Sequence, residues 1–278
     1  MIRWLLLALS MGVLLLPRDT ILPNLSAILL VIPLAIAGIR DHSTFRYWAV
    51  YVIGFFGFAY LRDLGDQLLP VLVRYPILLD QVLAMGSHPV VLIQQAYTPG
   101  NPRWWDYAAL TVHMSYFVAI PFTGILLWKS DRLRPLLLGA VVVYLSSVAV
   151  CILLPTAPPW MAGQMKAMPT VYRIIGDVLG GSTPGFYEYG LRVAGSNPVA
   201  AMPSVHAAAG FMVGLASWRT SWAWAGFGYA VAMGLSLVYL GEHYVVDVLA
   251  GWVLAVFCWR WVSLPVRTPP PPPGQPPE

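Results

Sequence analysis

The sequence is poor in charge: of 278 residues, only 10% are Asp, Glu, Lys or Arg, whereas 58% are hydrophobic. Soluble domains carry about 25% charged residues, so this composition excludes an ordinary soluble globular protein. The basic residues mostly punctuate the loops between apolar segments and form no basic face, which argues against nucleic acid as a partner.

Cysteine is nearly absent as well. The two cysteines, Cys151 and Cys258, both fall inside apolar segments, where small core hydrophobes are the better interpretation. The sequence therefore predicts neither a structural disulfide nor a cysteine metal site. Acidic residues form no cluster suited to Mg²⁺ or Zn²⁺, so we expect no metal and no cofactor.

Long apolar runs are abundant, and they predict an all-α polytopic membrane protein with about eight transmembrane helices. The expected spans are residues 4–16, 25–39, 45–61, 108–128, 135–154, 205–218, 222–240 and 244–262. The first run could pass for a signal peptide, but it lacks a convincing small-x-small cleavage site. We therefore expect it to be retained as a helix.

Composition divides the chain into four parts. Residues 1–62 hold the N-terminal transmembrane helices, and residues 63–107 form a mixed stretch that we expect to be interfacial or re-entrant. Residues 108–262 hold the remaining spans, together with the longest loop at 155–203, and residues 263–278 form a proline-rich disordered tail.

Basic residues in the short loops predict the orientation. Arg40 and Arg46 flank one turn, and Lys129, Arg132 and Arg134 crowd another. The positive-inside rule makes that side cytoplasmic, with both termini inside. The opposite side then holds the long loop and three histidines. We expect a single extracytoplasmic site in a plasma (or inner) membrane.

Two of these histidines carry the strongest signal. His206 ends the run AMPSVH, and His243 opens the pattern His-x-x-x-Asp, which closes on Asp247. An ionisable group at a membrane boundary is costly to desolvate, which favours a functional role. Residues i and i+4 share a helix face, so Asp247 can orient the His243 ring and support a positive charge on it. Ser204 occupies an N-cap position, where its hydroxyl and the following amides predict an anion cradle.

These motifs resemble those of the type 2 phosphatidic acid phosphatase superfamily. Residues 155–160 (PTAPPW), 201–206 (AMPSVH) and 242–247 (EHYVVD) look most like the inositol phosphorylceramide synthase (inositolphosphotransferase) branch. The last of these runs is also similar to sphingomyelin synthases. The resemblance covers roughly residues 106–262. It implies a six-helix, phosphatidic acid phosphatase-like catalytic core preceded by N-terminal helices.

Two positions depart from the superfamily pattern. Leu237 stands where its phosphatases carry Arg, six residues before the third-motif histidine. The run from Lys129 to Arg134 is two residues too short for the first motif and lies on the predicted cytoplasmic side, so we reject it as a phosphate site. Another cation must therefore stabilise the phosphate. The candidates are Lys166, Arg173 and Arg192 in the long loop and Arg103 before the fourth span.

The expected chemistry begins with neutral His243. One ring nitrogen attacks phosphorus while the other donates to Asp247, which gives a phosphohistidine intermediate. The resemblance implies that His206 is the general acid to the leaving oxygen and then the general base to the incoming hydroxyl. His113 fits a substrate-binding and a structural role equally well. Trp160 either binds substrate or anchors a rigid loop at the membrane interface.

The sequence thus favours a membrane phosphotransferase that takes a lipid phosphoester donor and a hydroxyl acceptor, which is inositol, a lipid alcohol or water. With water as acceptor, the chain is a lipid or polyprenyl phosphate phosphatase of the same superfamily. A non-enzymatic transporter is a third reading. It predicts polar groups at the bilayer midplane and symmetric halves, whereas this chain concentrates its polar groups at one face.

Overall fold

The computed structural model describes residues 21–62, 69–182 and 199–264. These residues form α-helices, one 3-10 turn and two isolated bridges, with no β-strand among them. The all-α class is therefore confirmed for the described part of the chain. The expected first span, Arg192 and the proline-rich tail lie outside the described residues.

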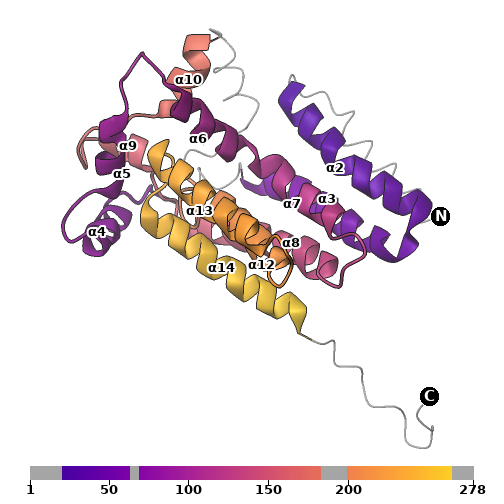
Figure 1. Cartoon of the computed structure of the whole chain (residues 1–278). Helices are drawn as coiled ribbons and strands as arrows, with labels where there is room; N and C mark the ends of the chain where they lie inside the picture. The colour runs from indigo at the N-terminus through magenta and orange to yellow at the C-terminus, as the bar shows by residue number, and fades with distance from the viewer. Residues whose placement is uncertain (1–20, 63–68, 183–198, 265–278) are drawn as a thin grey trace, which may run out of the picture.

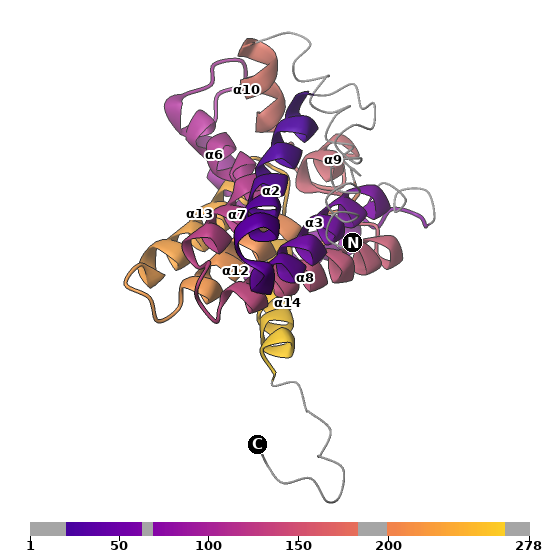
Figure 2. The ribbon, with the colours of Figure 1, turned by 90° about the vertical axis from the view of Figure 1, so that its right-hand side faces the viewer.

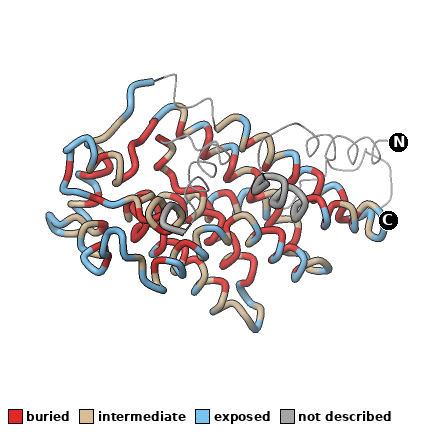
Figure 3. Tube along the Cα trace, turned by 90° about the horizontal axis from the view of Figure 1, so that it is seen from above, coloured by how far each residue is buried: buried red, intermediate tan, exposed pale blue. Residues whose placement is uncertain are grey.

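The long helices coincide with the apolar runs. They are α2 (Ile21–Arg40), α3 (His42–Arg62), α6 (Trp104–Met114), α7 (Tyr116–Leu126), α8 (Leu133–Leu153), α12 (Val205–Ser217), α13 (Ala223–Tyr239) and α14 (Val245–Ser263). Helix α12 is central, because it packs against α7, α8, α13 and α14 (Figure 1). Helix α2 lies on the outside of the bundle, over α3 and α7 (Figure 2). Buried residues follow the middle of this bundle (Figure 3).

Fewer helices than expected are long and apolar enough to cross a bilayer. Among the described residues these are α8 and α14, and the α6–α7 pair makes a third if it counts as one span. Helices α12 and α13 are apolar but have only 13 and 17 residues, below the roughly 20 that a bilayer requires. The number of eight spans is therefore not confirmed.

The expected fourth span is broken, because α6 and α7 meet at an angle of 59°. The break lies at Ser115, whose hydroxyl donates to the Val112 carbonyl at 2.6 Å. Back-bonding of this kind often bends helices. The bend thus has a local cause in the sequence.

Short helices lie at the end of the bundle where α14 begins (Figure 1). They are α4 (Arg74–Leu83), α5 (Pro89–Ile93), the 3-10 turn Gln94–Ala96, α9 (Pro159–Gln164) and α10 (Ile174–Ser182). The last two fall inside the segment 155–203, which the sequence analysis treats as a loop. Helix α9 starts with Pro159, and proline at the first helical position favours a helix start.

Helices α12 and α14 approach each other closely at Gly251. A Cβ atom at this position would lie 2.4 Å from the Ser204 carbonyl oxygen and 3.2 Å from the Ala208 nitrogen. Both contacts are with backbone, which cannot rotate away as a side chain can. Glycine therefore sets the separation of the two helices at the end of α12 that carries residues 204–206.

We expect Gly251→Ala to destabilise the protein, because overpacking of a core lowers the free energy of unfolding by about 1–3 kcal/mol. The matched control is Gly228→Ala in α13, where a new Cβ meets nothing within 4 Å. Alanine is favoured over glycine in a helix by about 0.5–1 kcal/mol, so the control should hold or gain stability. Thermal unfolding of the detergent-purified variants measures the difference. Equal midpoints would show that the close approach is not tight.

Candidate active site

Three histidines from different segments lie together, and we call them the histidine cluster. His113, in the last turn of α6, stacks on His206, in the first turn of α12, with ring centroids 4.6 Å apart and planes at 20°. The His243 centroid lies 6.2 Å from that of His206. The Tyr116 ring closes the group, 4.2 Å from His206. The structure thus brings together all three histidines that the sequence analysis selected.

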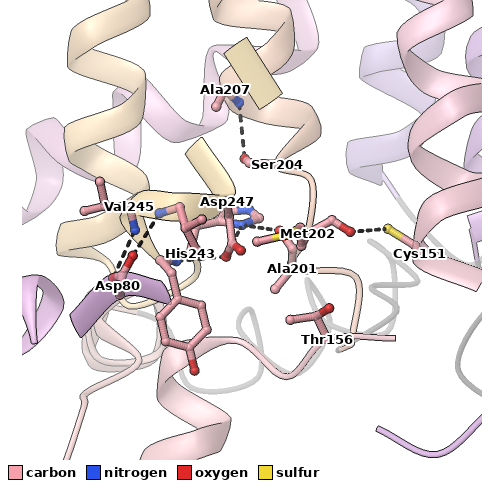
Figure 4. Close-up of polar contacts among 12 residues, drawn as sticks. Asp80, Cys151, Thr156, Ala201, Met202, Ser204, Ala207, His243, Val245 and Asp247 are labelled. Carbon is pink, nitrogen blue, oxygen red and sulfur yellow. Dashed lines mark hydrogen bonds and ion pairs between the residues drawn. The ribbon is translucent and has the colours of Figure 1, made fainter. Parts of the chain in front are cut away.

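A backbone carbonyl makes the shorter contact to the His243 ring. Its Nδ1 lies 2.9 Å from the Ala201 oxygen and 3.5 Å from Asp247 Oδ2 (Figure 4). A carbonyl oxygen only accepts hydrogen bonds, so Nδ1 carries the proton and donates it to Ala201. The lone pair of neutral His243 is then on Nε2. The sequence predicts that this hydrogen bond is donated to Asp247 and carries no signal for Ala201.

Asp247 is fully buried and faces the proton-bearing nitrogen of His243. Its Oδ2 accepts the Tyr244 N–H at 2.8 Å, at the N-terminus of α14. Among the described residues, Oδ1 has no hydrogen-bond partner. A negative charge is favoured at a helix N-terminus, and here it also stabilises positive charge on the ring.

Ser204 is the N-cap of α12, as the sequence predicts. Its Oγ accepts the Ala207 N–H at 3.3 Å, and the side chain is fully buried. Its own backbone N–H donates to the Asp247 carbonyl oxygen at 3.1 Å. Ser204 therefore joins the start of α12, with His206, to the start of α14. Binding of phosphate by its hydroxyl stays a prediction.

Arg173 is the loop cation that lies near the cluster, within electrostatic range of His113. Its Nε lies 2.7 Å from Glu242 Oε1, and its guanidinium lies over the Trp160 ring, 4.5 Å from the centroid. The charges of both Arg173 and Glu242 act on His113. Two of the predicted binding residues, Arg173 and Trp160, thus lie together beside the histidines.

A second arginine near the cluster, Arg62, was missed by the sequence reasoning. It stands in the last turn of α3, and its charge acts on His206 and Tyr116. A signal was present: Arg62 ends an apolar span on the predicted extracytoplasmic side, where the positive-inside rule disfavours basic residues. A basic residue in that position is a functional candidate.

The other proposed cations lie elsewhere. Lys166 is exposed after α9, and Arg103 stacks on Trp105 at the opposite end of α6 from His113. Arg132, in the run rejected as a first motif, donates to two carbonyls at the C-terminal end of α12, far from His206. Arg192 lies outside the described residues.

The position of the superfamily arginine holds a core residue. The Leu237 side chain is fully buried in α13, and its carbonyl oxygen accepts the backbone N–H groups of Glu242 and His243. No guanidinium reaches the phosphate from this position. Leu237 instead helps to shape the turn that presents His243.

Several buried polar atoms without a hydrogen-bond partner lie at the cluster. Among the described residues they include His113 Nδ1, Asp247 Oδ1 and Trp160 Nε1, whereas others, such as Trp48 Nε1 and Ser147 Oγ, lie elsewhere in the bundle. Buried polar atoms are normally satisfied, so those at the cluster fit a site that receives a polar substrate. Among all the residues that the structure describes, no group of three or more His, Cys, Asp or Glu side chains is arranged to hold a metal ion.

Gly241 closes the turn before His243 and allows several segments to meet there. Its φ is +80°, and a Cβ would lie 2.5 Å from the Tyr172 carbonyl oxygen. Its own carbonyl oxygen accepts the Trp160 N–H at 3.1 Å. Beside it the buried Gln94 amide donates to the carbonyls of Tyr172 and Tyr239, at 2.9 and 2.8 Å. Gln94 and Gly241 thus hold the turn in place.

An apolar helical bundle with a histidine cluster and a buried aspartate beside His243 fits one class of protein: membrane-embedded enzymes that act on phosphoesters. A family model described as the PAP2 superfamily matches residues 78–261, and the chain therefore belongs to that superfamily. Its members are in general phosphatases or phosphotransferases, so the chain is an integral membrane enzyme of this general type. Comparison with curated proteins gave no match, and neither did comparison with solved structures.

We expect Gly241→Ala to reduce activity, because the new Cβ both strains a positive φ and collides with the Tyr172 carbonyl. The control is Gly100→Ala, where φ is +72° but a Cβ meets nothing within 4 Å. Both variants carry the backbone strain, and only Gly241→Ala displaces the turn before His243. Turnover and thermal midpoint are measured for both. Similar turnover of the two variants would contradict the role of the close approach.

Proposed function

We propose that the chain is a membrane phosphotransferase that acts on a lipid phosphoester through a phosphohistidine intermediate on His243, resembling inositol phosphorylceramide synthases. The observation that carries the proposal is the hydrogen bond from His243 Nδ1 to the Ala201 carbonyl oxygen, 2.9 Å long. It leaves the lone pair on Nε2, as a nitrogen nucleophile requires. His206 lies beside it.

In the first step, His243 Nε2 attacks phosphorus, and the bond from phosphorus to the leaving oxygen breaks. Protonated His206 donates its proton to that oxygen. Asp247 stabilises the positive charge that forms on the His243 ring. In the second step, neutral His206 accepts the proton of an acceptor hydroxyl, whose oxygen attacks phosphorus and breaks the phosphorus–nitrogen bond. Both histidines end as they began.

Arg173 and Arg62 supply the positive charge that the equatorial phosphate oxygens need. Glu242 holds the Arg173 guanidinium through its ion pair, and Trp160 supports its face. His113 stacks on His206 and so restricts rotation of the general acid. Arg173 and Arg62 thus take the place of the superfamily arginine, whose position is occupied by Leu237. We propose a reaction that needs neither metal nor cofactor.

An apolar groove supports a substrate with a hydrocarbon chain. It has a volume of about 270 Å³, runs between α7 and α13, and begins at Ser115, two residues after His113. Most of its wall is apolar, including Val118, Phe122 and Val213. A lipid chain in this groove would leave the attached phosphate at the end where the histidine cluster lies. Neighbouring membrane lipids are then the source of the donor.

Phosphatase activity on a lipid or polyprenyl phosphate is the second candidate, because water as acceptor turns the same two steps into hydrolysis. The resemblance of residues 155–160 and 242–247 to the synthase branch favours transfer. Superfamily membership favours either enzyme over a transporter. We place the site on the extracytoplasmic side of a plasma (or inner) membrane, with both termini cytoplasmic, on the strength of the basic loops.

Phosphate labelling of the chain tests the nucleophile. The purified protein is incubated with radiolabelled phosphatidic acid or phosphatidylinositol, and acid-labile, base-stable label is measured. We expect label on the wild type and on His42→Ala, whose histidine is exposed at the start of α3, and none on His243→Ala. Equal label on His243→Ala and wild type would refute the assignment.

The same labelled protein separates transfer from hydrolysis. Label that leaves faster when inositol or a lipid alcohol is added supports a transferase. Label that leaves at one rate with or without these acceptors, releasing inorganic phosphate from phosphatidic acid, supports the phosphatase.

Leaving-group dependence tests His206. Removing a general acid lowers the rate by roughly 10²–10⁴-fold where the leaving oxygen needs a proton. We expect His206→Ala to lose this much on an alkyl phosphoester and far less on a nitrophenyl phosphoester, which leaves unprotonated. Steady-state turnover of both substrates measures this. An equal loss on the two would rule out the general-acid role.

A further inference from the structure

Asp80 is a buried carboxylate that neither the motifs nor the proposed chemistry uses. It lies in α4, and only 1% of its surface is exposed. Burying a carboxylate is costly unless hydrogen bonds compensate for the lost water. Burial raises the pKa of the Asp80 carboxyl, against the opposing effects of two backbone N–H groups and the nearby His88. A buried carboxylate of this kind therefore indicates a structural or functional role for Asp80.

Its partners are at the start of α14. Asp80 Oδ1 accepts the Val246 N–H at 2.8 Å, and Oδ2 accepts the Val245 N–H at 3.2 Å (Figure 4). The first N–H groups of a helix have no partner within the helix. Asp247 takes the Tyr244 N–H, and Asp80 takes the next two. Two carboxylates, one of them from a distant helix, thus hold a single helix start.

This helix start determines where both catalytic histidines lie. His243 lies two residues before Val245, the first residue that Asp80 holds, and its ring must stay within reach of the Ala201 carbonyl. In the same turn, the Asp247 carbonyl oxygen accepts the Ser204 N–H at the start of α12. A shift of α14 would therefore change the position of His243 relative to α12 and His206.

We propose that Asp80 is a positioning residue, whose carboxylate clamps the first turn of α14 and so keeps His243 aligned with His206. It contacts no reacting atom. The effect on catalysis rests on the proposed function, whereas the clamp itself does not. A displacement of about 1 Å in a catalytic group can reduce the rate about 10²-fold, so a loosened clamp is measurable in turnover.

The matched control is Asp41, another carboxylate that holds a helix start. It accepts the Ser43 N–H of α3 at 3.1 Å and the Trp128 indole N–H at 2.9 Å, at the other end of α3 from Arg62. Asp41→Asn removes a charged acceptor without touching α14. Asp80→Asn keeps the shape of the side chain and one acceptor oxygen, so the chain should still fold.

Hydrogen exchange tests the clamp. In the full-length protein in detergent, we expect the amides of residues 245–248 to exchange faster in Asp80→Asn than in the wild type. In Asp41→Asn they should exchange at the wild-type rate. Unchanged protection of residues 245–248 in Asp80→Asn would overturn the clamp, whatever reaction the chain catalyses.

Enzyme kinetics test the effect of the Asp80 clamp on catalysis. We expect Asp80→Asn to lower kcat by about tenfold with little change in KM, and by the same factor on alkyl and nitrophenyl phosphoesters, since a displaced nucleophile slows both. Asp41→Asn should keep kcat within about twofold of wild type. Normal kcat in Asp80→Asn, or an equal loss in Asp41→Asn, would overturn the positioning role. A wild type without turnover on any phosphoester would instead reject the proposed function and leave the exchange result standing.

Discussion

The hydrogen bond from the Ser204 amide to the Asp247 carbonyl oxygen is the contact on which the site depends. It joins the N-terminal ends of α12 and α14, and Gly251 leaves the space that the contact requires. Because both helices begin there, the positive ends of their dipoles point toward the same region. A phosphate between His206 and His243 would lie in that favourable field, which partly offsets the absence of an arginine at position 237.

Three charged groups of the site have close partners among the described residues. Arg173 has Glu242 beside it, Asp247 has His243, and Asp80 has the backbone N–H groups at the start of α14. A buried charge without a partner is expensive, and removing one member of a pair exposes that cost. The unpartnered buried atoms at the cluster, His113 Nδ1 and Asp247 Oδ1, are therefore informative, because a substrate bound there could supply their partners.

The parts of the site that the sequence predicted are those encoded by local patterns. His243 and Asp247 are four residues apart, and Ser204 precedes a helix as an N-cap should, so neither needs tertiary information. The carbonyl of Ala201 could not be predicted, because backbone atoms carry no residue-type signal. Asp80 and Arg62 are distant in sequence from the motifs, and only the packing of α4 and α3 brings them near.

The fold was predictable to a similar degree. Apolar runs identified the long helices, since hydrophobicity alone is sufficient for that. The 59° bend at Ser115 was not foreseen, because a serine within an apolar run also occurs in unbroken helices and only its hydrogen bond to Val112 shows the break. Helices α9 and α10 were missed because glycine and proline, which usually indicate loops, are frequent around them.

The shortness of α12 has a consequence for the position of His206. Its 13 residues span about 20 Å at 1.5 Å per residue, whereas the hydrocarbon layer is about 30 Å thick. Most of α12 is buried against α7, α8, α13 and α14, so protein rather than lipid surrounds this short helix. The position of His206, in its first turn, is therefore set by the packing of the bundle and not by the level of the surrounding headgroups.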